Sequence, residues 1–206
     1  MLNFSTFKLK LLNSRKKRNM KKNEYTKYQL GLALKELSKT NDLRKISISD
    51  ICILCNMNRG TFYYHFLDKQ ALINWIYHFD ITEPTRKILS ENPESWNEIS
   101  VFGLNKMLAD KSFYLQAIKI DEQNNLKEYI RTEIEGNWNL MLQRFADIYY
   151  PTECCENFQF YSDFMANGAW ATLIRWVNTG MKESPETLST LIDPISGNSM
   201  KAIFEF

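Results

Sequence analysis

The chain has 206 residues, of which 44% are hydrophobic and 24% charged, and its formal net charge is +2. With only seven Gly and five Pro, this composition fits a globular protein with a sizeable core and argues against a collagen-like or disordered chain. No apolar run approaches the roughly 20 residues of a membrane-spanning helix. The N-terminal basic cluster follows its short apolar stretch, unlike a signal peptide. We therefore expect a cytoplasmic protein without membrane contact.

The charge is unevenly distributed along the chain. Residues 1–23 hold eight of the 26 basic residues and no acid, so the remainder has 18 basic against 24 acidic residues. We expect residues 1–23 to form a flexible basic extension. Such an extension either contacts a polyanion or only improves solubility, and the sequence leaves both interpretations open.

Nearly every patterned segment has the period of a helix, and none shows a sustained period of two. Short helices are expected first, over residues 24–39, 48–55, 58–66 and from 69 onward. Ser47 and Asp50 have the spacing of a capping box, and Asn58 suits the start of the third helix. Asn56, between the second and third helices, tolerates the left-handed conformation of a tight turn. Two short helices joined by such a turn are typical of a helix-turn-helix.

Longer helices are expected in the second part of the chain, over residues 96–110, 112–119, 124–149 and 155–177. Pro84 should stop or bend the fourth helix. Gly180 should end the helix before it, and Ser184 and Pro185 should begin a last one. The fold class expected is therefore all-α, with a helix-turn-helix head over 24–70 and a helical body over 71–206.

The four cysteines do not indicate a metal site. Cys52 and Cys55 have C-x-x-C spacing, but no second ligand pair follows, and with Ile48 and Ile51 they fall on one helix face. We interpret them as small core residues, and Cys154 and Cys155 as reduced thiols. The sequence shows no catalytic triad, phosphate-binding loop or metal-ligand set, so neither an enzyme nor a cofactor is expected.

The third expected helix combines a buried face with a polar one. Phe62 and Phe66 lie four residues apart and should face the core. The candidate DNA-contacting residues are Ser47, Asn58, Arg59, Gly60, Thr61, Tyr63, Tyr64, His65 and Lys69. A helix fits the major groove of DNA, where Arg59 can donate two hydrogen bonds to guanine. Asn58 either contacts adenine or only caps the helix, whereas the long polar side chains that follow can reach phosphates.

Two alternatives remain for the aromatic residues of this helix. Tyr63 and Tyr64 could be half-buried packing residues, and His65 could brace the next helix instead of touching phosphate. Because His65 has no carboxylate or nucleophile beside it in the sequence motif, a catalytic role is not expected.

The segment "ISISDICILCNMNRGTFYYHFLDKQAL" resembles the DNA-binding head of TetR-family transcriptional regulators. The resemblance covers residues 24–80 and is carried by Ser47, Asp50, Ile51, Thr61, Phe62, Tyr63, His65, Phe66, Lys69 and Leu72. Asn56 stands where the family usually has Gly, and Cys52 where it usually has Ala; both are compatible with the fold. The resemblance implies that the chain binds double-stranded DNA.

The segment "GAWATLIRWVNTGMKESPETLSTLI" is similar to the last two helices of the DhaS-like branch of this family. In the family these helices form a four-helix dimer bundle, which implies a homodimer. Some regulators of this branch activate transcription and respond to a protein partner. The candidate interface residues are Phe164, Gly168, Ala169, Ala171, Thr172, Trp176, Leu188 and Leu191. The small residues allow close approach of helices, and the large ones supply contact area.

A ligand pocket in the body is a further expectation. Its candidate residues are apolar or amphipathic: Trp75, His78, Phe102, Met107, Phe113, Tyr114, Trp138, Met141, Phe145 and Tyr161. Each of them could equally be ordinary core packing. The sequence thus predicts a homodimeric regulator on a palindromic operator, modulated at its body by a small-molecule effector. In the alternative hypothesis, the body binds a protein co-regulator instead.

Overall fold

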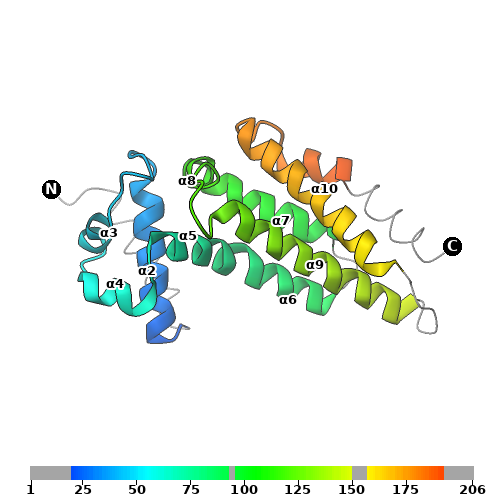
Figure 1. Ribbon diagram of the computed structural model, residues 1–206, viewed down its shortest axis with the longest axis horizontal. Coiled ribbons are helices and arrows are strands. Elements are labelled where there is room, and N and C mark those ends of the chain that lie inside the picture. Colours follow the sequence, from blue (N-terminus) through cyan, green and yellow to red (C-terminus); the bar gives the residue numbers. More distant parts are fainter. Residues whose placement is uncertain (1–19, 93–95, 150–156, 193–206) are drawn as a thin grey trace.

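The computed structural model describes residues 20–92, 96–149 and 157–192. Throughout these ranges the chain is all-α and forms no strand, which confirms the expected fold class. The molecule is elongated, with the helices of residues 22–65 at one end and the helices from residue 96 onward toward the other (Figure 1). Most of the basic extension, Cys154, Cys155 and the tail after Pro194 lie outside the described residues.

The head consists of α2 (Lys22–Leu37) and the shorter helices α3 (Ile48–Leu54) and α4 (Arg59–His65). The capping box of α3 is confirmed, since the Ser47 hydroxyl accepts from the Asp50 N–H and the Asp50 carboxylate accepts from the Ser47 N–H. Asn56 has φ 54°, the left-handed conformation expected for the turn. The Met57 N–H then bonds to the Cys52 carbonyl at 2.8 Å and closes the end of α3.

A continuous rod connects the head to the body. It consists of α5 (Lys69–Tyr77), the π-helical turn η1 (His78–Thr82) and α6 (Glu83–Glu91), which follow one another beneath the body (Figure 1). Pro84 lies at the start of α6 and does not stop the helix. The wider turn before it lets the Glu83 N–H reach the His78 carbonyl, and the Thr85 hydroxyl donates to the Ile81 and Thr82 carbonyls. A π-helical turn therefore accommodates the proline that the sequence predicted to break or bend the rod.

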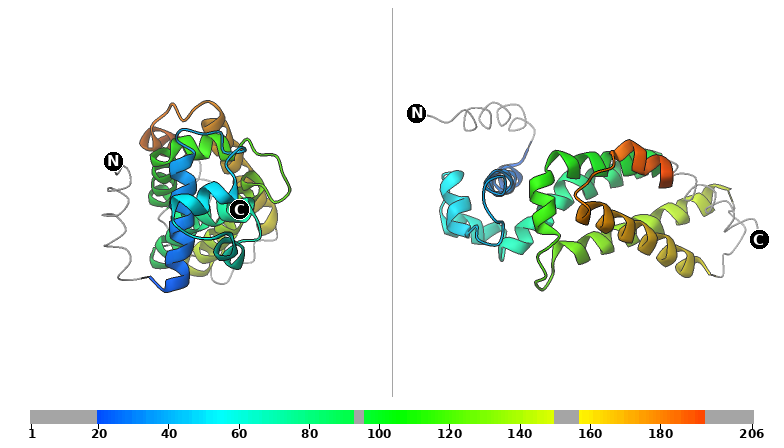
Figure 2. Two further views of the ribbon diagram at one scale, coloured as in Figure 1. Left: turned by 90° about the vertical axis from the view of Figure 1, so that its left-hand side faces the viewer. Right: turned by 90° about the horizontal axis from the view of Figure 1, so that it is seen from above.

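The body is built on α7 (Trp96–Ala109), α8 (Lys111–Ala117), α9 (Leu126–Tyr149) and α10 (Phe158–Asn178). The chain is helical again at residues 185–192, after a turn in which Gly180 has φ 89°. The Ser184 hydroxyl accepts from the Thr187 N–H, which confirms the expected cap. α10 packs mainly along α9 in the body (Figure 2).

One hydrophobic core runs from the head into the body. It joins Leu30, Phe62 and Leu72 at the head to Tyr114 and Trp176 in the body. A second, smaller cluster fills the far end of the body with Leu89, Ile99, Trp138, Met141, Leu142, Phe145 and Ala166. Among the described helices none is long and apolar enough to cross a bilayer.

Polar groups also join the head to the body. Lys35 on α2 is paired with Asp80 of η1 and, at 2.7 Å, with Asp110 before α8. The Ser38 carbonyl at the end of α2 accepts hydrogen bonds from the side chains of Ser112 and Gln116 on α8. The position of α2 is thereby fixed relative to both the rod and α8.

Candidate nucleic-acid interface and body cavity

Helix α4 has one buried and one exposed face. Phe62 is fully buried and Phe66 nearly so, and their rings pack 5.8 Å apart, as the spacing predicts. On the opposite face Tyr63 is 50% exposed and Tyr64 75% exposed. Arg59 and Gly60 are exposed as well. The polar face of α4 is therefore accessible and is not part of the protein core.

The start of α4 depends on Asn58. Its side-chain oxygen accepts from the Thr61 N–H at 2.7 Å and from the Thr61 hydroxyl at 3.1 Å. A Cβ at Gly60 would lie 3.2 Å from this oxygen, so glycine leaves room for the cap. Because reading an adenine edge would also need this oxygen, the structure favours the capping role among the two roles considered for Asn58.

Arg59 is held along the exposed face of α4 by Tyr63, one turn later. One guanidinium nitrogen donates to the Tyr63 hydroxyl at 3.3 Å, and the guanidinium carbon lies 5.9 Å from the centre of the Tyr63 ring. Tyr63 thus restricts the long side chain, and this contact uses one of the five N–H groups of an arginine. The rest of the planar fork can face a partner.

His65 is half-buried between aromatic neighbours. Its ring lies 4.9 Å from that of Tyr64 and 6.5 Å from that of Phe66. Burial and the nearby Lys27 lower the pKa of the imidazole, so the neutral form dominates at pH 7. Its ring contacts therefore lie at the end of its own helix, and a phosphate contact by His65 would be made by an uncharged donor.

Lys69, at the start of α5, has a role that the sequence did not predict. Its ammonium group donates to the carbonyls of Leu43, Arg44 and Ile46 at 2.8, 3.1 and 2.9 Å. A lysine ammonium has three N–H donors, so the three carbonyls of the loop before α3 use all of them. Burial also lowers the pKa of Lys69. The geometry supports a bracing role for Lys69 rather than the expected phosphate contact.

The cysteine pair of α3 packs inside the head. Cys52 is buried, Cys55 is half-buried, and both are free thiols. Burial raises the pKa of both thiols, that of Cys55 from 9.0 to about 11, because a thiolate would lose its hydration. Neither thiol is therefore activated as a nucleophile, in agreement with their interpretation as core residues.

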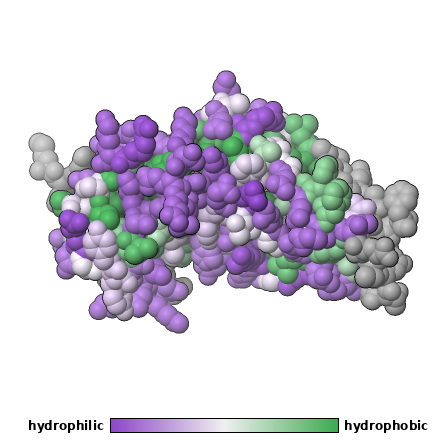
Figure 3. Space-filling model, in the orientation of Figure 1, coloured by the Kyte–Doolittle hydropathy of each residue, from purple (hydrophilic) through white to green (hydrophobic). Residues whose placement is uncertain are grey.

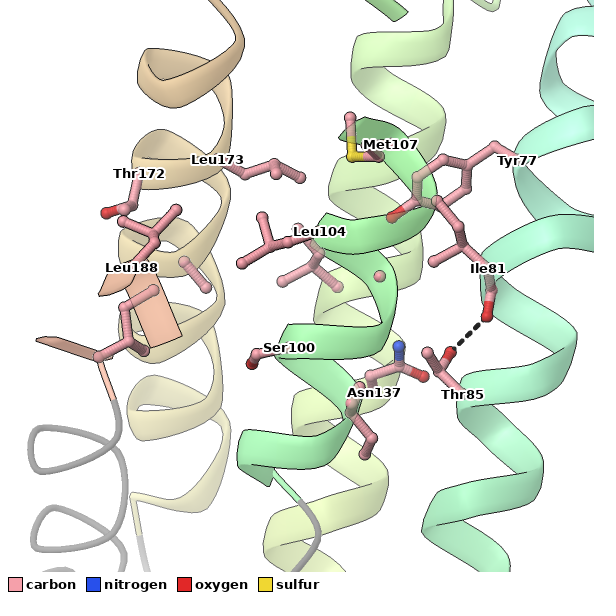
Figure 4. A pocket seen from close by; sticks show the side chains of 15 residues that line it. Tyr77, Ile81, Thr85, Ser100, Leu104, Met107, Asn137, Thr172, Leu173 and Leu188 are labelled. Carbon is pink, nitrogen blue, oxygen red and sulfur yellow. Dashed lines mark hydrogen bonds between the residues drawn. The ribbon is translucent and has the colours of Figure 1, made fainter. Parts of the chain in front are cut away.

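A cavity of about 110 Å³ lies in the body between the rod and the helices α7, α9 and α10 (Figure 4). Its described lining residues are Tyr77, Ile81, Thr85, Ile99, Ser100, Gly103, Leu104, Met107, Ile134, Asn137, Ala169, Thr172, Leu173, Leu188 and Ile192. The rod contributes Tyr77, Ile81 and Thr85, so one wall of the cavity belongs to the element that carries the head.

The outer side of α10 is an exposed apolar face. Phe160 and Phe164 stack with their rings 6.4 Å apart, and Phe164 is 69% exposed. Gly168 and Ala171 continue the exposed stripe at helical spacing, and no other described group lies within 4 Å of a Cβ built on Gly168. Leu191, in the helical segment 185–192, is 64% exposed. Figure 3 shows hydrophobic side chains grouped where α10 and this segment lie.

A family model described as "Transcriptional regulator C-terminal region" (TetR_C_8) matches residues 94–196, half of the chain. The chain belongs to the TetR family of transcriptional regulators. Its body is similar in sequence to the DhaS-like branch, as the next comparison indicates.

One relative of this TetR-family chain is the "HTH-type dhaKLM operon transcriptional activator DhaS" of Lactococcus lactis subsp. lactis (strain IL1403). It is 29% identical over 106 residues, and the match spans about half of each protein, 50% of this chain and 54% of the relative. A solved structure titled "Dihydroxyacetone kinase operon activator DhaS" superposes with a TM-score of 0.66 over 87% of this chain and 96% of that one. At 20% identity, this likeness shows a shared fold.

The cavity of this TetR-family protein is not the expected one. Among the described residues, only Met107 of the candidate set lines it. Phe113 and Tyr114 are buried in the main core, whereas Trp138, Met141 and Phe145 fill the second cluster. Trp75 packs against the main core and stacks on Phe79, and His78 bonds to the Tyr129 hydroxyl. Phe102 and Tyr161 also lie away from the cavity. The lining also includes small and polar residues such as Ser100, Gly103 and Asn137. They were not predicted, because the expected pocket residues were mostly bulky and aromatic.

The candidate interface residues also divide into separate groups. Phe164, Gly168, Ala171 and Leu191 are exposed on the outer face. Trp176 and Leu188 are buried in the core of their own protomer, and the Trp176 ring N–H donates to the Glu183 carbonyl at 2.9 Å. Ala169 and Thr172 line the cavity. Of the candidate residues on α10 of this TetR-family chain, the structure therefore exposes Phe164, Gly168 and Ala171.

Proposed function

We propose that the chain is a sequence-specific DNA-binding transcriptional regulator that acts as a homodimer. The observation that carries this proposal is the accessible polar face of α4, with Arg59 held across it by Tyr63. A helix presented in this way fits the major groove, and the guanidinium fork matches the O6 and N7 acceptors of guanine. Membership of the TetR family supports the same conclusion.

A second copy of the chain is the proposed partner of the outer face of α10. The exposed stripe of Phe160, Phe164, Gly168 and Ala171 combines aromatic area with small residues that allow close helix approach. Pairing these faces about a two-fold axis gives a symmetric dimer. Its two α4 helices would meet half-sites about 34 Å apart, one turn of DNA, on a near-palindromic operator.

The body is the proposed site of regulation. A small molecule bound in the cavity would contact Tyr77 and Ile81 on the rod that carries the head. A ligand that binds one arrangement of the rod better than another would shift the population of DNA-binding dimers. The alternative proposal is that a protein co-regulator acts on the body instead; the cavity favours the small molecule.

Selection of bound duplexes from a random pool tests the proposal directly. Repeated selection with the full-length protein should enrich one near-palindromic sequence, and sedimentation should give one dimer on each enriched duplex. Enrichment of no sequence, with equal binding to every duplex, would contradict sequence-specific regulation. Enrichment of a single half-site bound by a monomer would contradict the dimer.

A further inference from the structure

The size of the body cavity restricts what it can hold. Its volume is about 110 Å³, and helices of the rod and the body border it on several sides (Figure 4). A protein cavity of roughly 150 Å³ accommodates benzene, so a cavity of this size suits a molecule of about six non-hydrogen atoms. A small metabolite fits this volume as a whole, whereas a protein partner could insert no more than a side chain.

The lining of the cavity restricts the charge of its occupant. None of the described residues that line it carries a charge. Burying an ion without a partner of opposite charge costs far more than burying a neutral molecule of the same size. An uncharged occupant is therefore expected.

One buried polar atom of the lining has no hydrogen-bond partner among the described residues. The side-chain oxygen of Asn137, on α9, is buried and accepts no hydrogen bond from any group in the described ranges. The Thr85 hydroxyl, on the rod, already donates to the Ile81 and Thr82 carbonyls, so it too can offer its oxygen as an acceptor. Figure 4 shows the Asn137 carboxamide and the Thr85 hydroxyl at the same end of the cavity. A buried acceptor without a donor is costly, and a ligand hydroxyl or N–H would satisfy it.

We propose that the cavity binds a small uncharged molecule with at least one hydroxyl or N–H group, which donates to the Asn137 side-chain oxygen. The apolar part of the molecule packs against Leu104, Met107 and Leu173. The proposal rests on the proposed function only in assigning the molecule as the effector; binding itself can be measured without DNA.

Three probes of similar size test the proposal by isothermal titration of the full-length protein. Cyclopentanol has the hydroxyl, methylcyclopentane replaces it by a methyl group, and butanoate carries a charge. Cyclopentanol should bind about fivefold more tightly than methylcyclopentane, the value of one hydrogen bond, and butanoate should not bind. Equal affinity for the first two would overturn the role of the hydroxyl. Binding of butanoate, or of no probe, would overturn the assignment of the cavity.

The variant Asn137→Leu separates a ligand contact from a structural role. Leucine has nearly the shape of asparagine but no acceptor, so the variant should lose the preference for cyclopentanol and unfold at a higher temperature. Asn139→Leu is the matched control, because the Asn139 oxygen is also buried without a described partner but does not line the cavity. The control should be stabilised with its probe affinities unchanged. A destabilised Asn137→Leu that keeps the preference would contradict the proposal.

DNA binding is measured separately on the same preparations. If cyclopentanol binds and no duplex is selected, the cavity assignment stands and the proposed function fails. If a duplex is selected but no probe binds, the proposed function stands and the cavity assignment fails.

Discussion

The ammonium group of Lys35, in the head, is paired with the carboxylate of Asp80, in the π-helical turn that borders the cavity. Ile81, the next residue, lines the cavity itself. Asp110, before α8, is the second partner of Lys35. The part of the rod next to the cavity is therefore joined by an ion pair to α2, the helix against which the head packs.

Replacing Lys35 by methionine should destabilise the protein by about 3 kcal/mol, because Asp80 and Asp110 would lose their shared counterion in a partly buried site. Denaturant unfolding at pH 7 measures this difference. The control Lys39→Met removes an exposed pair with Glu36 and should cost little. A loss no larger than that of the control would show that the pairing is not important for stability.

The contribution of Lys35 should depend on pH only in alkaline solution. Burial opposes its charge, but the carboxylates of Asp80 and Asp110 outweigh burial, and the pKa is raised above its ordinary value of 10.5. A raised lysine pKa means that the stabilisation is complete below 10.5 and declines as the pH rises through the higher folded-state pKa. The difference between wild type and Lys35→Met should thus be constant from pH 7 to 9 and should shrink above 10.5.

Lys69→Met should lower the free energy of unfolding by about 2 kcal/mol, because three carbonyls of the loop before α3 would lose their charged donor. Thermal unfolding measures this effect, with the exposed Lys45→Met as a control. A phosphate contact contributes about one unit to the dependence of log affinity on log salt concentration. We expect this slope to stay unchanged in Lys69→Met; a slope flattened by one unit would restore Lys69 to the DNA-contacting set.

Arg59→Ala should weaken binding to the selected operator by about 1–3 kcal/mol and relax the base preference at one position of each half-site. Titration of labelled duplexes that vary at that position gives both quantities. Arg44→Ala is a suitable control, since Arg44 is exposed on the loop before α3 and is paired with Asp42. Equal weakening on random DNA would mean that Arg59 contacts only phosphate.

Gly168→Leu should raise the dissociation constant of the dimer about tenfold or more, because the leucine would be inserted between closely packed helices of the two copies. Since no other group in the described part of the chain lies within 4 Å of the Gly168 Cβ position, that part leaves room for the side chain. Gly136→Leu, at an equally open glycine on α9, is the matched control. Sedimentation equilibrium distinguishes the two variants, and an intact Gly168→Leu dimer would remove α10 from the proposed interface.

The head could be predicted closely from the sequence because its signals are local. The side chains of Ser47, Asn58 and Asp68 each cap a helix by accepting from the backbone N–H three residues later. Asn56 forms the turn by its own left-handed conformation. The burial of Phe62 and Phe66 follows from their spacing alone.

The sites of the body could not be predicted in this way, because they depend on which helix faces which. Trp176 has the character of an interface residue, yet the turn after Gly180 brings the Glu183 carbonyl back to its ring N–H inside the protomer. A cavity remains where side chains are small, as at Gly103 and Ala169, and no periodicity marks such places. A break was predicted at Pro84 because the missing N–H of a proline is visible in the sequence. The π-helical turn that accommodates Pro84 depends on the packing of the whole rod and is not visible there.

The π-helical turn has a consequence for the length of the rod. Each residue advances an α-helix by about 100°, so inserting or deleting one residue between Tyr77 and Thr85 would rotate everything beyond it by that angle. Tyr77 and Thr85 now point into the same cavity from opposite sides of the turn, while Asp80 between them reaches Lys35. The number of residues in this segment therefore sets the rotational register of the rod. With a different number, Tyr77 and Thr85 would no longer face the same cavity while Asp80 faces Lys35.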